Sequence, residues 1–299
     1  MRRALAEYLQ DSAAEENLFF LTGDLGFQVF DSFREKHPDR YLNVGISEAA
    51  LIGIAAGLSY SGYTPVTYSI ASFLTSRAYE QMRFFSGYNE MKIVNIGAGG
   101  GLAYSLSGST HHALDDIGLA ALIPGLKVYA PTGPNELKAI LNQASSSQDS
   151  SYIQIGKFGE EDITPATSLK GSKSNSRNIG VISSGTISTY IRNNLIDADF
   201  NSTITHLHVG QISPLIHNDI IQFVNSSDEV ICVDEQLPNS GLYVQLLRFL
   251  NENDLNKRVH RLGSKNGFIH TNRSLETNRQ HFGYDWNAIS SLIKIIEKK

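Results

Sequence analysis

Cysteine is almost absent from this sequence, because Cys232 is the only one among 299 residues. A single thiol excludes a disulfide framework within the chain and is typical of a reducing compartment, so we expect a cytoplasmic protein. Cys232 lies in the apolar run Val230–Val233, which reads as a buried strand. That setting favours a structural thiol over a catalytic nucleophile.

An excess of one charge and a long apolar run are also missing. The 25 basic and 30 acidic residues give a net charge of −5, so we expect neither nucleic acid nor an anionic membrane surface as a partner. No stretch approaches the length of a membrane span, and Glu7, Gln10 and Asp11 interrupt any apolar segment near the N-terminus. Hydrophobic residues make up 41% and charged residues 18%, which is enough for a large globular core.

Short apolar segments alternate with helical patterns along the chain, which predicts an α/β fold with parallel strands covered on both faces. Three regions follow from this pattern. Residues 1–160 form a first α/β unit, residues 161–178 have the Ser-, Lys- and Asn-rich composition of a linker, and residues 179–299 form a second unit. The alternative for the middle region is a long surface loop within one domain.

The glycines of Asn95–Gly101 invite a dinucleotide-binding interpretation, but the spacing does not fit. The third glycine of the G-x-G-x-x-G pattern would fall at Leu102, and a polar segment follows where a helix is needed. A loop at the mouth of an active site is the better interpretation.

The segment Asn43–Leu58 is small and apolar except for one charge, Glu48. A carboxylate in the first turn of an apolar helix is costly to bury without a partner. Two interpretations remain open at this point. Glu48 either caps its own helix and complements the helix dipole, or it serves a ligand.

Three segments carry a resemblance to a known family. Val44–Glu48 with the apolar run after it, Phe73 followed by Arg77–Arg83, and Gly108–His112 resemble, in order and spacing, motifs of the transketolase family of thiamine diphosphate enzymes. The resemblance implies a pyrimidine-binding domain with a parallel sheet, followed by a transketolase C-terminal-like domain. It also implies that Glu48 hydrogen-bonds N1′ of the cofactor's aminopyrimidine ring and is catalytic.

The same resemblance implies an aromatic platform beneath the pyrimidine. The family spaces aromatic residues three apart; Phe73 matches one of them, but Ile70 stands three positions earlier. Ile70, Phe73 and Arg77 are therefore predicted to bind the cofactor with Glu48, with Tyr68 or Tyr79 as further candidates for the platform. The alternative for Phe73 is core packing.

Four residues are predicted to bind substrate. By resemblance His111 lies beside the reactive carbon, where an imidazole can hold or move a proton near neutral pH, so it is also predicted to be catalytic. His112 adjoins it, and Lys157 and Arg2 lie near family contacts with substrate phosphate. The alternatives are a structural histidine for His111 and solvated cations for Lys157 and Arg2.

The sequence departs from the family pattern at three places. A histidine and an aspartate that the family carries fall at Gly99 and Ser107, which indicates an unusual donor or acceptor. The Gly-Asp-Gly motif that opens the family's magnesium-diphosphate site, with an Asn about 25–30 residues later, has no match; Asp24 lies in a Gly-Asp-Leu-Gly turn instead. We therefore expect a partner subunit, resembling the transketolase N-terminal half, to hold the diphosphate and Mg²⁺ (or Ca²⁺), with no metal ligand in this chain.

The resemblance predicts the smaller subunit of a split transketolase-like enzyme, arranged as an α2β2 assembly. It would transfer a two-carbon ketol unit from a ketose, phosphorylated or not, to an aldehyde. The alternatives are the beta subunit of a 2-oxo-acid dehydrogenase, an enzyme like deoxyxylulose-phosphate synthase, or a non-catalytic homologue. Consumption of a ketose rather than pyruvate would separate the first prediction from its two enzymatic rivals.

Overall fold

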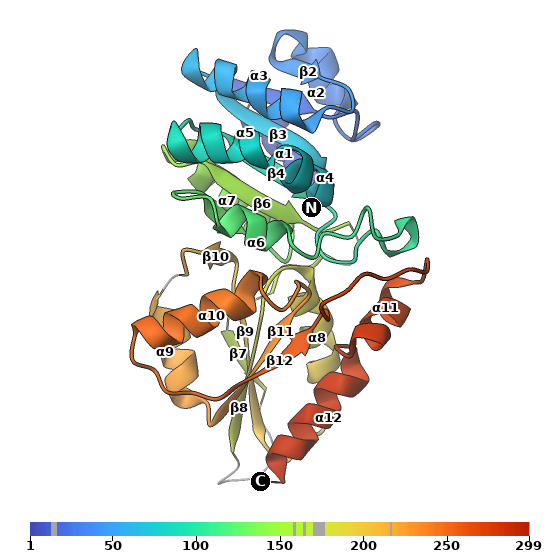
Figure 1. Ribbon diagram of the computed structural model, residues 1–299, viewed down its shortest axis with the longest axis vertical. Helices are drawn as coiled ribbons and strands as arrows, with labels where there is room; N and C mark the ends of the chain where they lie inside the picture. The colour runs from blue at the N-terminus through green and yellow to red at the C-terminus, as the bar shows by residue number, and fades with distance from the viewer. Residues whose placement is uncertain (13–16, 158–159, 164–165, 170–176, 216, 299) are drawn as a thin grey trace.

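The computed structural model describes residues 1–12, 17–157, 160–163, 166–169, 177–215 and 217–298, and it contains two β-sheets lying one beyond the other (Figure 1). The first sheet has the strand order β10-β5-β6-β4-β3-β1-β2. All its neighbouring strands pair in parallel except β10, which pairs antiparallel with β5. Its strands are β1 (Leu18–Thr22), β2 (Tyr41–Asn43), β3 (Thr64–Ile70), β4 (Val94–Ala98), β5 (Lys127–Tyr129), β6 (Ser151–Ile155) and β10 (Gln211–Ser213).

Helices cover both faces of the first sheet, as the apolar strands require. One core cluster joins α1 and α7 to the sheet, and a second cluster joins α3, α4 and α6 to the opposite face. The two central strands β3 and β4 are buried almost throughout, because each has helices on both sides. The helices are α1 (Arg2–Asp11), α2 (Asp31–Lys36), α3 (Glu48–Tyr60), α4 (Ala71–Arg77), α5 (Tyr79–Met82), α6 (Asp116–Ala121) and α7 (Pro134–Ser146). Short 3₁₀ turns at Pro38–Arg40 and Ser105–Ser107 and a π-helix at Arg83–Tyr88 complete this part.

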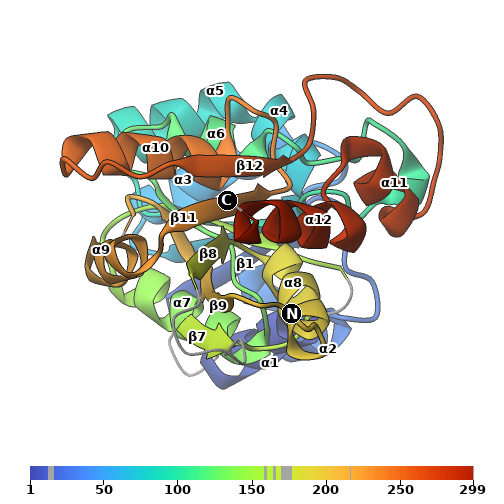
Figure 2. The same cartoon turned by 90° about the horizontal axis from the view of Figure 1, so that it is seen from below.

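The second sheet has the order β12-β11-β8-β9-β7, parallel except for the antiparallel edge strand β7. Its helices α8 and α12 pack on one face, and α9 and α10 pack on the other (Figure 2). The strands are β7 (Ala166–Leu169), β8 (Asn178–Ser183), β9 (Thr203–His208), β11 (Glu229–Asp234) and β12 (Val259–Gly263). The helices are α8 (Thr186–Ile196), α9 (His217–Ser226), α10 (Gly241–Glu252), α11 (Leu275–Phe282) and α12 (Trp286–Glu297).

The predicted fold class is confirmed, since both sheets are largely parallel and covered by helices. The thiol of Cys232 is fully buried in β11, as expected for a structural cysteine. None of the helices in the described ranges is both long and apolar enough to cross a lipid bilayer.

The predicted linker, residues 161–178, contains more order than its composition indicates. β7 lies within it and pairs with β9, so this part belongs to the second sheet, whereas 164–165 and 170–176 fall outside the described residues. β10 also crosses the predicted division, because it follows β9 in the chain but pairs with β5 in the first sheet. The exact domain boundaries stay a prediction.

Candidate functional site

Glu48 is the first residue of α3, and its carboxylate is buried, with the residue only 3% exposed. Ser69, near the end of β3, donates a hydrogen bond from its hydroxyl to Oε1 over 3.1 Å. Arg77 donates from Nη1 to Oε2, also over 3.1 Å. These partners lie outside α3, so the carboxylate faces other elements instead of capping its own helix. The helix N-terminus adds a favourable dipole to the ionised form.

Arg77 makes a second contact with a flat surface. It ends α4, and its guanidinium carbon lies 4.0 Å from the centroid of the Phe73 ring on the preceding turn. Such stacking of a planar cation on an aromatic face is favourable. The Arg77 side chain is 48% exposed, whereas its carboxylate partner is buried. The ion pair is therefore closed on the Glu48 side and open to solvent on the Arg77 side.

His111 adjoins the other side of this cluster. Its ring meets the Phe73 ring edge-on at 4.8 Å between centroids, and the Tyr104 ring lies 5.8 Å away. Burial lowers the pKa of His111 from its usual value, and the charges of Arg77 and Lys157 lower this pKa further. The imidazole is consequently neutral at pH 7, so it can accept a proton there.

Lys157 and Arg2 lie around Tyr104. The Lys157 ammonium sits 4.2 Å from the centroid of the Tyr104 ring, and burial together with the nearby Arg2 charge lowers the pKa of Lys157. Arg2 is partly buried rather than freely solvated. The two predicted phosphate contacts therefore belong to one electropositive region.

The Tyr104 ring also explains the glycine at position 99. Gly99 has a φ of +80°, which side-chain-bearing residues rarely adopt, and a Cβ there would lie 2.0 Å from the Tyr104 ring. Tyr104 thus fills the space that a histidine at position 99 would need. A side chain at position 99 would therefore require the Tyr104 ring to move.

A cavity of about 470 Å³ opens beside Phe73 and Arg77. Both halves of the chain line it, and Ser109 donates a hydrogen bond to the Ile269 carbonyl across this junction. Phe268, at the rim, is 73% exposed. The lining residues are Ser72, Phe73, Ser76, Arg77, Ser109, Thr110, His112, Leu114, Asp115, Leu237 and the segment 266–269.

The structure brings Glu48, Phe73, Arg77 and His111 together from separate segments of the chain. His112 is buried, with Nε2 3.3 Å from the Ser105 carbonyl oxygen, yet it lines the cavity. Ile70 is only the last residue of β3, immediately before α4. The individual roles of all these residues stay predictions.

Tyr68 was a candidate for the aromatic platform, and the structure shows that this was wrong. Its ring is fully buried in the core, 4.9 Å from the Phe30 ring and 6.3 Å from the Phe20 ring. Tyr79, the other candidate, packs against the core cluster of α3 and α6. The aromatic neighbours of Phe73 are instead His111 and, beyond it, Tyr104.

Sequence reasoning missed three contributors: Ser69, Tyr104 and the loop 266–269. Ser69 had a weak signal, because a buried carboxylate needs donors and Ser69 adjoins the predicted Ile70. The loop 266–269 belongs to the second half of the chain and had no local signal.

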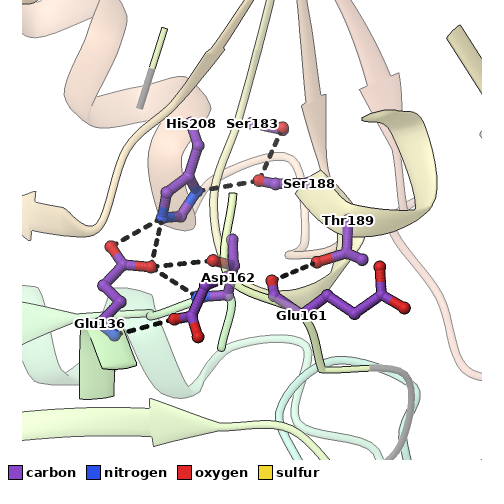
Figure 3. A network of polar contacts seen from close by, with 8 residues as sticks. Glu136, Glu161, Asp162, Ser183, Ser188, Thr189 and His208 are labelled. Atoms are coloured by element: carbon purple, nitrogen blue, oxygen red, sulfur yellow. Dashed lines mark hydrogen bonds and ion pairs between the residues drawn. The ribbon is translucent and has the colours of Figure 1, made fainter. Parts of the chain in front are cut away.

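A second polar cluster lies where the two sheets meet (Figure 3). Glu136 on α7 faces His208 on β9, with His208 Nε2 2.9 Å from Glu136 Oε1. His208 Nδ1 lies 3.0 Å from the Ser188 hydroxyl, which in turn is 2.8 Å from the Ser183 hydroxyl. The order of groups resembles a hydrolytic triad, but Ser188 is fully buried and out of reach of a substrate. We assign this cluster a structural role.

Among the described residues, no group of three or more His, Cys, Asp or Glu side chains is arranged to hold a metal ion. The prediction of a metal concerned the partner subunit, and it stays a prediction.

Comparison with known proteins places the chain in a family. The model of the transketolase pyrimidine-binding domain matches residues 1–157, more than half of the chain. The chain therefore belongs to the transketolase family, which implies thiamine diphosphate as cofactor. The family resemblance is thus confirmed.

Particular relatives sharpen this assignment. The chain is 29% identical, over 87% of its length and 86% of the other's, to one of the subunits of the apulose-4-phosphate transketolase of Actinobacillus succinogenes. It is 26% identical to 1-deoxy-D-xylulose-5-phosphate synthase of Syntrophus aciditrophicus, covering 88% of this chain but only 42% of that protein. Its fold is that of a solved split gene transketolase, an inactive beta4 tetramer, with a TM-score of 0.78, 21% identity and coverage of 98% and 96%.

Proposed function

We propose that this chain is one subunit of a heteromeric, thiamine diphosphate-dependent transketolase-like enzyme. The reaction is transfer of a two-carbon ketol unit from a ketose donor to an aldehyde acceptor. One observation carries the proposal. The buried Glu48 carboxylate accepts a hydrogen bond from the flat, cationic guanidinium of Arg77, and this guanidinium stacks on the Phe73 ring. An aminopyrimidine needs the same two contacts, one to a carboxylate and one to an aromatic face.

The residues present therefore fit the cofactor's pyrimidine half. When bound, thiamine diphosphate supplies a nucleophilic carbon that attacks a carbonyl and allows the adjacent carbon–carbon bond to break and form. Glu48 would hold the ring nitrogen N1′ through one carboxylate oxygen, and Ser69 fixes the other by its hydrogen bond to Oε1. The apolar surroundings strengthen the bond, since a hydrogen bond in a low dielectric has a large electrostatic effect.

His111 serves the substrate in this proposal. Its neutral imidazole can accept a proton from a hydroxyl of the ketose and return it to the product. Phe73 and Tyr104 hold the imidazole between them and shield it from water on those sides. The lowered pKa of His111 keeps the accepting form populated at pH 7.

Lys157 and Arg2 supply positive charge for an anionic group on the sugar. Both act near Tyr104, whose ring replaces the polar side chain that the family carries at position 99. The relative from Actinobacillus succinogenes is named for apulose-4-phosphate, a phosphorylated sugar. A sugar phosphate of unusual structure is accordingly the substrate class we propose, with His112 contributing to the cavity wall.

The proposal includes a partner. A second polypeptide with the Gly-Asp-Gly motif would bind the diphosphate and Mg²⁺, and two copies of each chain would form an α2β2 assembly in the cytoplasm. Support comes from the relative that is itself named as one subunit of its enzyme and from the fold shared with a split gene transketolase. The rival function, a synthase that consumes pyruvate, is supported by the likeness to 1-deoxy-D-xylulose-5-phosphate synthase.

The test is to co-express this chain with a polypeptide that carries the Gly-Asp-Gly motif and to titrate the complex with thiamine diphosphate and Mg²⁺ by calorimetry. We expect tight binding by the complex and none of comparable strength by this chain alone. The complex should then consume a ketose phosphate and not pyruvate. Tight binding by the isolated chain would refute the shared site, and consumption of pyruvate would establish the rival.

A further inference from the structure

Arg77 makes, within this chain, both contacts that an aminopyrimidine would make. Its Nη1 donates to Glu48 Oε2 over 3.1 Å, and its planar guanidinium lies 4.0 Å above the Phe73 ring. A guanidinium is flat, delocalised and rich in N–H donors, as is the amidine edge of a 4-aminopyrimidine. Two planar groups cannot stack on the same face of one ring and donate to the same carboxylate oxygen.

We propose that Arg77 occupies the aminopyrimidine position in the free chain and must withdraw before the cofactor binds. The inference rests on the proposed function, and it changes the role predicted for Arg77 from a cofactor contact to a competitor of the cofactor. Arg77 is then an internal placeholder that controls entry to the site.

The surroundings of Arg77 allow this withdrawal. Arg77 is the last residue of α4, and half of its side chain faces solvent, so it can change rotamer without unwinding the helix. The cavity of about 470 Å³ lies beside it and offers space. Asp115 lines the same cavity and provides a carboxylate that the displaced guanidinium can approach.

A placeholder has a clear physical use in the free subunit. A buried carboxylate without a charged partner is unfavourable, and without Arg77 only the Ser69 hydroxyl would contact Glu48 before the cofactor arrives. Arg77 neutralises the charge until a ligand replaces it. The site is thereby kept in shape, at the cost of a weaker apparent affinity for the cofactor.

The expected competition is moderate. Partly exposed ion pairs and guanidinium–ring stacks are each weak contacts, so the occupied form outnumbers the open form only about tenfold. The apparent dissociation constant rises by the inverse of the open fraction. Removing the placeholder should therefore tighten binding of an aminopyrimidine about tenfold.

The experiment uses the full-length chain without partner and the fragment 4-amino-5-hydroxymethyl-2-methylpyrimidine, titrated by NMR. Arg77→Met keeps the length and apolar stem of the side chain but loses the donors and the charge. Arg83→Met is the matched control, since Arg83 is an exposed arginine at the start of the π-helix after α5 and lines a different cavity. We expect R77M to bind the fragment about tenfold more tightly than the wild type, and R83M to bind it equally.

Two further variants separate the outcomes. Arg77→Lys keeps a cation for Glu48 but has no flat face, so its affinity for the fragment should fall between those of the wild type and R77M. If R77M does not fold, R77K takes its place in the test. The double variant R77M/E48Q should lose the gain. Fragment affinity that does not rise in R77M or R77K, including binding too weak to detect, overturns the placeholder. If R77M/E48Q binds as tightly as R77M, Glu48 is not the anchor and the proposed function fails instead.

Discussion

Glu48 and Glu136 offer an informative comparison, because each lies in the first turn of a helix and faces a basic side chain. Glu48 pairs with Arg77 and accepts a hydrogen bond from Ser69. Glu136 pairs with His208 and accepts two hydrogen bonds from Thr132. The local chemistry of the two clusters is therefore similar.

The two clusters differ in what lies beyond the basic partner. Arg77 is 48% exposed and borders a cavity, whereas the His208 side chain is 1% exposed and its Nδ1 faces the buried Ser188 hydroxyl. The Glu48 pair meets solvent through its basic partner, whereas the Glu136 pair meets it through the carboxylate, which is 27% exposed and lines a smaller cavity of about 250 Å³. A cavity beside such a pair therefore does not by itself indicate a ligand site. What distinguishes the Glu48 pair is the aromatic face of Phe73, against which its basic partner stacks.

Of the substitutions that test the difference between the two clusters, Glu48→Gln should have the largest effect. The amide cannot provide the charge that the proposed cofactor contact needs, so turnover of the complete complex should fall at least about 100-fold. The measurement is ketose consumption under saturating cofactor, with thermal unfolding as the control for folding. Turnover within a factor of a few of the wild type would remove Glu48 from the mechanism.

Glu136→Ala should act on stability instead. It leaves the His208 ring without its carboxylate partner at a buried junction, which costs about 1–3 kcal/mol of unfolding free energy. Turnover of the folded complex should be close to that of the wild type. Glu7→Ala is the matched control, because Glu7 pairs with Lys138 of the same helix α7 on an exposed surface and should destabilise the fold less than Glu136→Ala does. Equal destabilisation by both variants would mean that the Glu136–His208 pair contributes no more to stability than an exposed ion pair on the same helix.

Asp116 is a third carboxylate, fully buried, and it differs from Glu48 and Glu136 because its hydrogen-bond donors among the described residues are neutral side chains. Its donors are Tyr152, Gln154 and Gln236, and burial raises its pKa to about 6. Since the folded pKa lies above the unfolded value, its protonation stabilises the fold at low pH, and this contribution disappears as the pH rises from about 4 through 6.

Denaturant unfolding of wild type and Asp116→Asn across pH 4 to 7 measures this contribution. The wild type should lose stability relative to the variant over that range, while titration of Asp234, common to both proteins, cancels. Parallel pH profiles for the two proteins would contradict the raised pKa.

The smallest expected effect concerns His111. Burial is the largest cause of its lowered pKa, and the Arg77 charge is a smaller one. Arg77→Met should therefore raise the pKa of His111 by a fraction of a unit, as followed by NMR titration of the ring protons. Arg83→Met should leave this pKa unchanged. A fall of the pKa in R77M would show that Arg77 does not face the imidazole.

Much of the fold could be predicted from the sequence, because long apolar strands alternate with amphipathic helices. The apolar run Val230–Val233, which reads as a buried strand, lies within β11. β7, β10 and β12 could not be predicted, because each is short and partly polar. β7 and β10 also depend on pairing with strands that are not their neighbours in the sequence.

The candidate site divides in the same way. Glu48, Phe73 and His111 stood out through motifs, and the structure places them together. The pairing of Arg77 with Glu48 could not be predicted, since it depends on the angle between α3 and α4. Tyr68 could not be excluded as a candidate from the sequence, because its position in the chain does not show that its side chain points into the core cluster.

The antiparallel strand β10 limits where the chain can be cut, or joined to another protein, without loss of folding. A genetic break anywhere between residues 160 and 210 would separate β10 from its partner β5 and leave the edge of the first sheet unprotected. Bare sheet edges recruit strands from other molecules and promote aggregation. The smallest transferable unit carrying Glu48 therefore extends past Ser213. Because β8 pairs with β11, and β11 with β12, a joint that leaves both sheets whole lies beyond Gly263.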